Sequence, residues 1–215
     1  MKRVLIRTED QRRAASVAIA AFLVGGTVGR RPPDPIHEWV TEGRRTTNER
    51  AIAAGAHQRP YSSCGDLAHA VLWCLGCRDE HLVNRDSDGG QTPWVMGVNI
   101  SRLCASPAYV RATRGMDPHQ GDVLHVQSPD HVSILGSRGA GAWTTCDYGQ
   151  PYGMQRSRLA VRGSDGIWVV GGRRLVGWLD LQRVEYRESA IVPDDFDGAE
   201  EDDNPYPEDV GWPVG

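Results

Sequence analysis

The chain has 215 residues, of which 40% are apolar, so it can bury a real core and disorder of the whole chain is excluded. Its formal net charge of −4 is unevenly distributed. Residues 193–215 carry nine acidic residues and no basic one, which leaves residues 1–192 with a net charge of +5. That body is only mildly basic and has no dense run of Lys and Arg of the kind that phosphate backbones need. We therefore expect no nucleic-acid partner.

The first predicted element is a helix over residues 9–24. Residues 14–29 form the longest apolar run and follow Arg12-Arg13, which superficially suggests a secretory signal. Residues 8–11, however, form a capping-box pattern with acidic groups where a helix begins, and the run is short for a membrane span. We expect a protein that is made in the cytoplasm without a signal peptide and that does not associate with membranes.

A buried helix is predicted after two short ones over residues 34–40 and 48–56. Ser62 or Ser63 can cap it, positions 67, 71, 72 and 75 place apolar side chains on one face, and Gly76 ends it. Cys64 then lies in the first turn of this helix. Another short helix is predicted over residues 99–105.

From Gly121 onward the apolar residues alternate with polar ones, as in strands. The six predicted strands cover residues 122–126, 131–135, 142–148, 154–161, 167–170 and 173–178. Gly171-Gly172 fits a hairpin turn between the last two. Helices followed by antiparallel strands predict an α+β fold.

Two regions of the chain are expected to differ in order. Residues 1–192 form the predicted domain, and residues 193–215 a flexible acidic tail that can bury little. Exposed charge contacts are weak, so deletion of the tail is expected to leave the melting temperature nearly unchanged. The tail is also the expected contact segment for any protein partner.

Cys64 is the candidate nucleophile. A helix N-terminus favours the thiolate, which is the reactive form of cysteine. His131 opens a predicted strand after a turn, and Asp147 lies near the end of the next strand, so a base and a group that orients it can come together. Each residue alone also has an ordinary structural explanation: a small buried hydrophobe, a turn histidine and a turn former.

Four segments carry a resemblance to a known family. They are residues 9–26, Tyr61-Ser62-Ser63-Cys64-Gly65-Asp66-Leu67, Gly121-Asp122-Val123-Leu124 and Asp130-His131-Val132-Ser133-Ile134-Leu135-Gly136. Over residues 9–180 the chain resembles NlpC-type cysteine peptidases, which are papain-fold hydrolases of bacterial cell-wall peptides and related amides. The family usually has Asp-Cys-Ser-Gly around the nucleophile, and its third residue is often His or Asn.

The resemblance implies a papain-like fold, with the nucleophile helix packed on an antiparallel sheet, and a catalytic triad. By it, Cys64 is the nucleophile, His131 the base and Asp147 the orienting residue. The backbone N–H of Cys64 and the hydroxyl of Tyr61 are the expected oxyanion donors. Peptidoglycan stem peptides are the implied substrate, with no cofactor. A protein made without a signal peptide would be delivered to the bacterial cell wall by a phage or a secretion apparatus.

A metal or redox site is the main alternative for the other cysteines. Cys74 and Cys77 have Cys-x-x-Cys spacing, with His69 and His81 nearby. The spacing also follows from the end of a helix at Gly76, and a second Cys-x-x-Cys pair does not occur in the sequence. We therefore expect no metal site and free thiols in a reducing compartment.

Two further alternatives concern the base and the function. His125 competes with His131, although alternation along residues 123–126 predicts that His125 faces outward. A non-enzymatic assembly or binding module with a papain-like fold, for instance of a phage particle, is the alternative to an amide hydrolase. Faster alkylation of Cys64 than of the other thiols would distinguish the enzyme from the module.

Overall fold

The computed structural model describes residues 1–24, 64–79, 82–83, 100–127, 131–138, 142–147 and 159–202. Within these ranges the helices are α1 (Glu9–Val24), α3 (Cys64–Cys74), α4 (Ile100–Ala105) and the 3-10 turn η2 (Leu181–Arg183). The strands are β1 (Lys2–Leu5), β2 (Tyr109–Arg111), β3 (Val123–Val126), β4 (His131–Arg138), β5 (Trp143–Cys146), β6 (Leu159–Arg162), β7 (Trp168–Val170), β8 (Arg173–Leu179), β9 (Ser189–Val192) and β10 (Glu200–Glu201). The short helices predicted over 34–40 and 48–56 lie outside the described residues.

The larger sheet closes into a six-stranded barrel. Its order is β8–β3–β4–β5–β6–β7, and β7 pairs back onto the first residues of β8, while β2 pairs with the last residues of β8 on the edge opposite β3. Every pairing is antiparallel. The six predicted strands correspond to β3 through β8. Gly171 and Gly172 have φ values of 55° and 81° and connect β7 to β8, which confirms the predicted hairpin turn.

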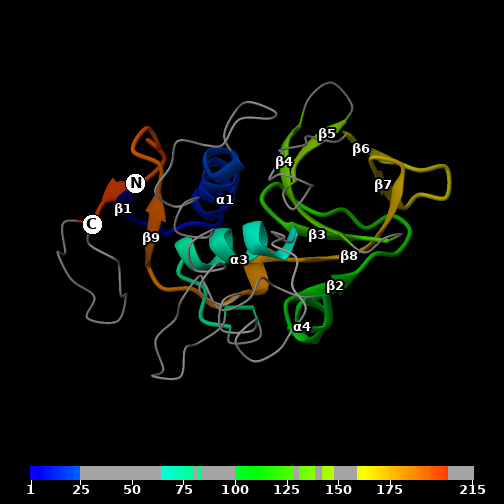
Figure 1. Cartoon of the computed structure of the whole chain (residues 1–215), viewed down its shortest axis with the longest axis horizontal. Coiled ribbons are helices and arrows are strands. Elements are labelled where there is room, and N and C mark those ends of the chain that lie inside the picture. The colour runs from blue at the N-terminus through cyan, green and yellow to red at the C-terminus, as the bar shows by residue number, and fades with distance from the viewer. Residues whose placement is uncertain are drawn as a thin grey trace, which may run out of the picture.

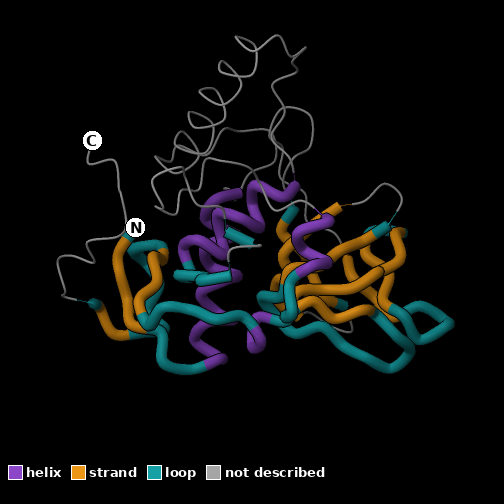
Figure 2. Tube along the Cα trace, turned by 90° about the horizontal axis from the view of Figure 1, so that it is seen from below, coloured by secondary structure: helices purple, strands orange, loops and turns teal. Residues whose placement is uncertain are grey.

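α1 and α3 lie between the barrel and a smaller sheet. Figure 1 shows α1 and α3 in the middle of the molecule, with the barrel on one side and the β10–β1–β9 sheet on the other. Figure 2 shows the same arrangement from below, with the two long helices between two groups of strands. The predicted α+β class is confirmed, with few helices and a strand-rich core.

α1 begins with the predicted capping box. The Thr8 hydroxyl accepts a hydrogen bond from Gln11 N at 3.2 Å, and the Gln11 side chain accepts one from Thr8 N at 3.1 Å. The same amide oxygen accepts from Arg7 N at 2.9 Å. These bonds use backbone donors that a helix start otherwise leaves without partners, so the helix begins at Glu9.

α3 ends in a Schellman turn that requires glycine. Gly76 has φ +74°, and its N–H donates to the Trp73 carbonyl at 2.9 Å, while Cys77 N–H donates to the Leu72 carbonyl at 3.0 Å. A Cβ at Gly76 would lie 2.8 Å from the Ser189 carbonyl oxygen. The turn therefore explains the Cys74–Cys77 spacing as the end of a helix.

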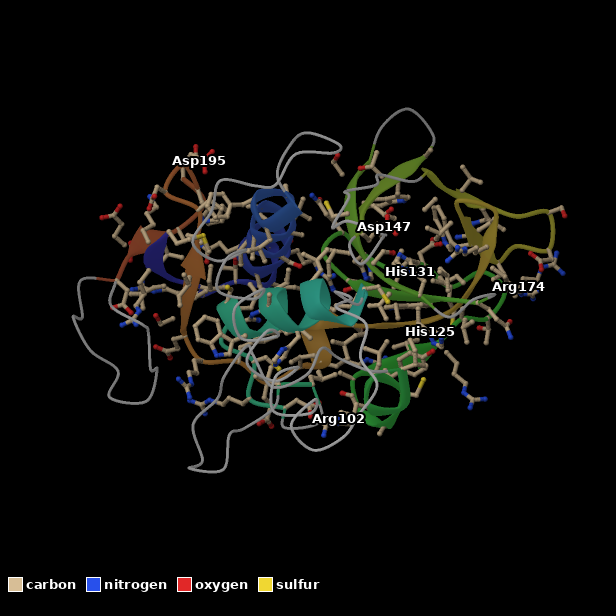
Figure 3. All side chains as sticks on the ribbon, viewed as in Figure 1. Arg102, His125, His131, Asp147, Arg174 and Asp195 are labelled. Atoms are coloured by element: carbon tan, nitrogen blue, oxygen red, sulfur yellow. The ribbon has the colours of Figure 1, made fainter. Side chains whose placement is uncertain are left out.

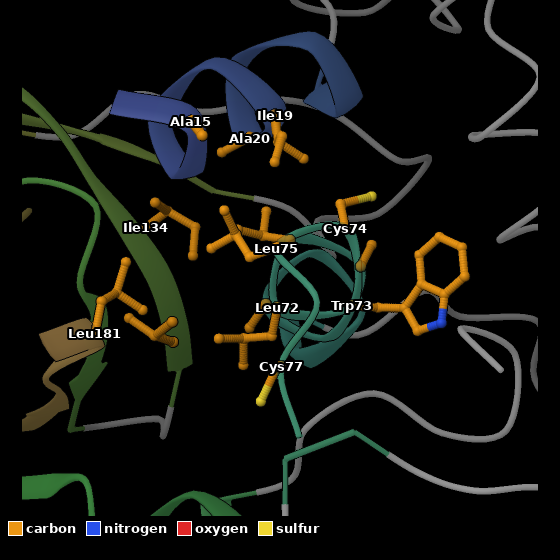
Figure 4. Packing of buried hydrophobic residues seen from close by; sticks show 14 of the residues in the cluster. Ala15, Ile19, Ala20, Leu72, Trp73, Cys74, Leu75, Cys77, Ile134 and Leu181 are labelled. Atoms are coloured by element: carbon orange, nitrogen blue, oxygen red, sulfur yellow. The ribbon is translucent and has the colours of Figure 1, made fainter. Parts of the chain in front are cut away.

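The core has two parts, which meet at the barrel wall. The first part lies on the helix side of the barrel and contains residues of α1 and α3. Figure 4 shows Ile19 of α1 and Leu72 of α3 near Ile134 of β4. The second cluster consists of Val110, Leu124, Val126, Leu135, Ala160, Val170, Leu175 and Trp178. Neighbouring residues of a strand point to opposite faces, so β3 and β4 are buried on both sides.

The small sheet was not predicted, and it includes part of the acidic segment. β1 lies between β9 and β10, with Val4 opposite Ala190 and Glu201. Phe196 is 9% exposed and belongs to the helix-side core. Residues 193–202 therefore pack against the body, and residues 203–215 lie outside the described residues. The division of the chain at residue 192 stays a prediction.

Substitution of Phe196 by alanine is expected to lower the free energy of unfolding by about 3 kcal/mol, because a buried aromatic ring is removed. Urea denaturation followed by tryptophan fluorescence measures this change. Asp197→Ala is the control, since Asp197 is exposed and its replacement should cost less than about 0.5 kcal/mol. By the same reasoning, deletion of residues 193–215 should lower stability, which differs from the expectation based on charge alone. Equal stability of the two point variants would contradict this packing.

Candidate active site

Cys64 is the first residue of α3 and is half-buried. Burial is the largest influence on its pKa and raises it, but a hydrogen bond from His131, the nearby charge of that ring, and the backbone N–H groups of Val132 and Gly65 together outweigh burial. The pKa of Cys64 is therefore lowered from its ordinary value. The sulfur is held where a thiolate is stabilised.

His131 is the first residue of β4 and lies between Cys64 and Asp147. Its Nε2 is 2.5 Å from Asp147 Oδ1, so Nδ1 is the ring nitrogen left for the sulfur. Burial lowers the pKa of His131, while the hydrogen bonds and charges of Asp147 and Cys64 raise it, and the result is a pKa of about 9. A proton on this imidazole is favoured at neutral pH.

Asp147 directly follows β5, and its side chain is fully buried. Oδ1 faces His131, and Oδ2 accepts a hydrogen bond from the Thr145 hydroxyl at 2.5 Å. Figure 3 shows His131 and Asp147 next to each other on the side of the barrel toward α3. Both carboxylate oxygens therefore have a donor.

The fold thus brings together the three residues singled out from the sequence. α3 packs on β4, and β4 pairs with β5, so a helix and two neighbouring strands carry Cys64, His131 and Asp147. The arrangement can supply a nucleophilic thiolate, a proton donor and acceptor, and a carboxylate that fixes the ring. Tyr61 lies outside the described residues.

No family model, curated protein or solved structure matches the chain.

The other cysteines have different surroundings. Burial, the largest influence, raises the pKa of Cys77 to about 12 and that of Cys146 to about 11, where the Asp147 charge adds to it. Cys74 is buried at the end of α3, and Cys104 is exposed on α4. None of the five cysteines forms a disulfide. The thiol that combines partial exposure with a lowered pKa is Cys64.

His125 is buried rather than outward-facing, so that prediction is wrong. The residue is 4% exposed, because β3 is a barrel strand that is buried on both faces. Nδ1 is 2.9 Å from the Tyr109 hydroxyl and 3.9 Å from Cys104 Sγ. A side chain in place of Gly177, opposite His125, would clash with Tyr109. Figure 3 places His125 apart from Asp147, toward α4.

The Gly121-Asp122 pair connects α1 to the barrel. Gly121 has φ +86°, and a Cβ there would lie 2.9 Å from the Arg13 carbonyl oxygen. Asp122 accepts from Arg13 Nη1 at 2.7 Å, and the same guanidinium also bonds Glu9 at 2.6 Å and Asp180 at 3.2 Å. This motif therefore holds the framework that positions β4 against the helices, and Arg13 was not singled out from the sequence.

The sequence also raised the question of a metal site and a membrane span. Within the described ranges, no group of three or more His, Cys, Asp or Glu side chains is placed to hold a metal ion. His81 lies outside those ranges. A helix long and apolar enough to cross a membrane is not found in the part of the chain that the structure describes.

Proposed function

We propose that the protein is a cysteine hydrolase of amide bonds that acts through Cys64, His131 and Asp147. The observation that carries this proposal is the hydrogen-bonded chain from a half-buried thiol of lowered pKa, through an imidazole, to a fully buried carboxylate. A thiolate–imidazolium pair of this kind is a nucleophile and an acid held ready for acyl transfer.

The reaction would proceed in two steps. Cys64 Sγ attacks the carbonyl carbon of the amide, and the oxygen that gains charge lies near the Cys64 N–H at the start of α3. The C–N bond then breaks as His131 gives its proton to the leaving amine, which leaves a thioester. His131 next takes a proton from water, the hydroxide adds to the thioester, and the carboxylic acid leaves as the thiolate re-forms.

The substrate class rests on the resemblance to NlpC-type peptidases. The papain-type arrangement, with a nucleophile on a helix and the base and its partner on neighbouring strands, supports a papain-like fold. We propose stem peptides of bacterial peptidoglycan as the substrate and delivery to the wall by a phage or a secretion apparatus. Every proton-transfer group in this scheme is a side chain, so the proposed reaction uses no cofactor.

Digestion of purified peptidoglycan by the wild-type protein and by Cys64→Ala, followed by mass spectrometry of the released fragments, tests the activity. Iodoacetamide labelling near neutral pH tests the nucleophile without a substrate. Cys104 is the internal reference, because it is exposed whereas Cys64 is half-buried. Faster labelling of Cys64 than of Cys104 supports the enzyme, and equal or absent labelling of Cys64 favours the non-enzymatic assembly module.

The rate of hydrolysis is expected to follow a bell-shaped pH profile. Activity should rise through a pKa below 9, the ordinary thiol value, as Cys64 loses its proton, and fall near pH 9 as His131 loses the proton that the leaving amine needs. The folded-state pKa of His131 exceeds its ordinary 6.5, so its stabilising effect is complete below pH 6.5 and is lost as pH rises through about 9. Measurement of kcat/KM from pH 5 to 10.5 checks the profile, and an alkaline limb near pH 6.5 would contradict it.

Histidine substitutions distinguish the two candidate bases. His131→Ala is expected to lower hydrolysis by at least about 10³-fold and to raise the pKa of Cys64, because the imidazolium partner is lost. His125→Ala removes a buried ring that contacts Tyr109, so it should lower stability and leave the Cys64 alkylation profile unchanged. Kinetics, alkylation and melting of both variants provide the test. The reverse pattern would identify His125 as the base.

A further inference from the structure

Thr145 contacts the site through Asp147. It lies on β5, is 1% exposed, and its hydroxyl donates to Asp147 Oδ2 at 2.5 Å. The two residues are separated by one position, so both side chains point to the same face of the strand. The other oxygen of the carboxylate, Oδ1, is 2.5 Å from His131 Nε2.

We propose that Thr145 is a positioning residue for the Cys64–His131 pair, an inference that rests on the proposed function. A carboxylate held by one oxygen can rotate about its Cβ–Cγ bond, whereas one held by both oxygens has a fixed plane. The Thr145 hydroxyl therefore keeps Oδ1 in line with His131 Nε2. A ring held at Nε2 in turn presents Nδ1 to the sulfur of Cys64.

The hydroxyl, rather than the shape of the side chain, carries this role. Threonine and valine fill a buried strand position with nearly the same volume, so valine keeps the packing and removes the hydroxyl. Valine cannot donate to Asp147 Oδ2. Loss of that bond would remove the hydrogen bond to Oδ2, weaken the hold of the carboxylate on the imidazolium and make the thiolate less favourable.

The test compares Thr145→Val, Thr145→Ser and Thr144→Val by alkylation of Cys64 with iodoacetamide between pH 4 and 10. Thr144 is a matched control on the same strand, since its hydroxyl bonds the Ser137 carbonyl at 3.2 Å and does not contact Asp147 among the described residues. We expect Thr145→Val to shift the inflection upward by about 0.5 to 1 pH unit and to slow alkylation at pH 6 by about three- to tenfold. Thr145→Ser and Thr144→Val should stay within about twofold of the parent.

The outcomes separate the two proposals. A parent protein whose Cys64 alkylates no faster than Cys104 overturns the proposed function. A parent with an activated Cys64 and an unchanged profile in Thr145→Val overturns the role of Thr145 alone. NMR titration of the His131 ring in Thr145→Val should give a lower pKa than in the parent and in Thr145→Ser. If Thr145→Val does not fold, the same upward shift of the Cys64 alkylation inflection is expected in Thr145→Ala.

Discussion

Replacement of Cys64 by alanine is expected to lower amide hydrolysis by about 10⁴- to 10⁶-fold, the range that loss of a catalytic nucleophile causes in comparable triads. Cys77 and Cys146 cannot take its place, because their pKa values are raised to about 12 and about 11. The substitution removes one half-buried sulfur and keeps a good helix former at the start of α3. The variant should therefore unfold cooperatively within a few degrees of the parent.

Cys104→Ala is the matched control, since it removes an exposed thiol near His125, the competing candidate base. It should retain full activity and the parent's melting temperature. Initial rates on peptidoglycan and calorimetric melting of both variants make the comparison. Turnover by a folded Cys64→Ala protein at more than about a hundredth of the parent's rate would exclude Cys64 as the nucleophile.

Replacement of Arg13 by methionine is expected to lower the free energy of unfolding by about 3 to 5 kcal/mol, because it removes the cation that pairs with the buried Asp122 carboxylate. The guanidinium is 9% exposed and bonds Glu9, Asp122 and Asp180, and the Asp122 side chain is fully buried. Burial is the largest influence on the pKa of Asp122 and raises it, while Arg13 lowers it. Without Arg13 that pKa rises further, so the loss of stability should shrink as pH falls and Asp122 takes up a proton.

Arg7→Met provides the comparison for Arg13→Met. Arg7 pairs with Glu200 at 3.1 Å, but the two side chains are 65% and 74% exposed, so the change should cost no more than about 1 kcal/mol. Urea denaturation at pH 7 and pH 4.5 measures both variants. Equal losses for Arg7→Met and Arg13→Met would show that the Arg13 network does not stabilise the fold.

Local signals in the sequence were sufficient for the helices and the barrel strands. The capping box at Thr8 and the glycine after α3 set helix ends through contacts within one turn, and the period of two marks each of the strands from β3 to β8. The small sheet has no comparable signal. β10 is only two residues long, and β1 pairs with strands from the far end of the chain, so nothing near β1 in the sequence indicates its partners.

Some residues of the candidate site could also be predicted from local signals in the sequence, and others could not. Cys64, His131 and Asp147 each have a local context, a helix start or a strand end, that the sequence displays. Thr145 could have been found, since alternation along β5 places it on the same face as Asp147. Arg13 could not, because Asp122, just before β3, and Asp180, just before η2, are remote from it in sequence. The sequence predicted that His125 faces outward, because alternation does not distinguish a strand with one buried face from a strand that is buried on both faces.

The position of β1 between β9 and β10 has a consequence for the order of folding. During synthesis, residues 2–5 are made long before residues 189–201, so neither neighbouring strand exists yet when β1 has been made. The barrel can close earlier, once β8 reaches both β3 and β7. Pairing of such distant segments is slow, because a long loop must be closed before any contact compensates for the lost entropy. β1 is thus made long before its partner strands, and until they arrive its edges are open to other chains.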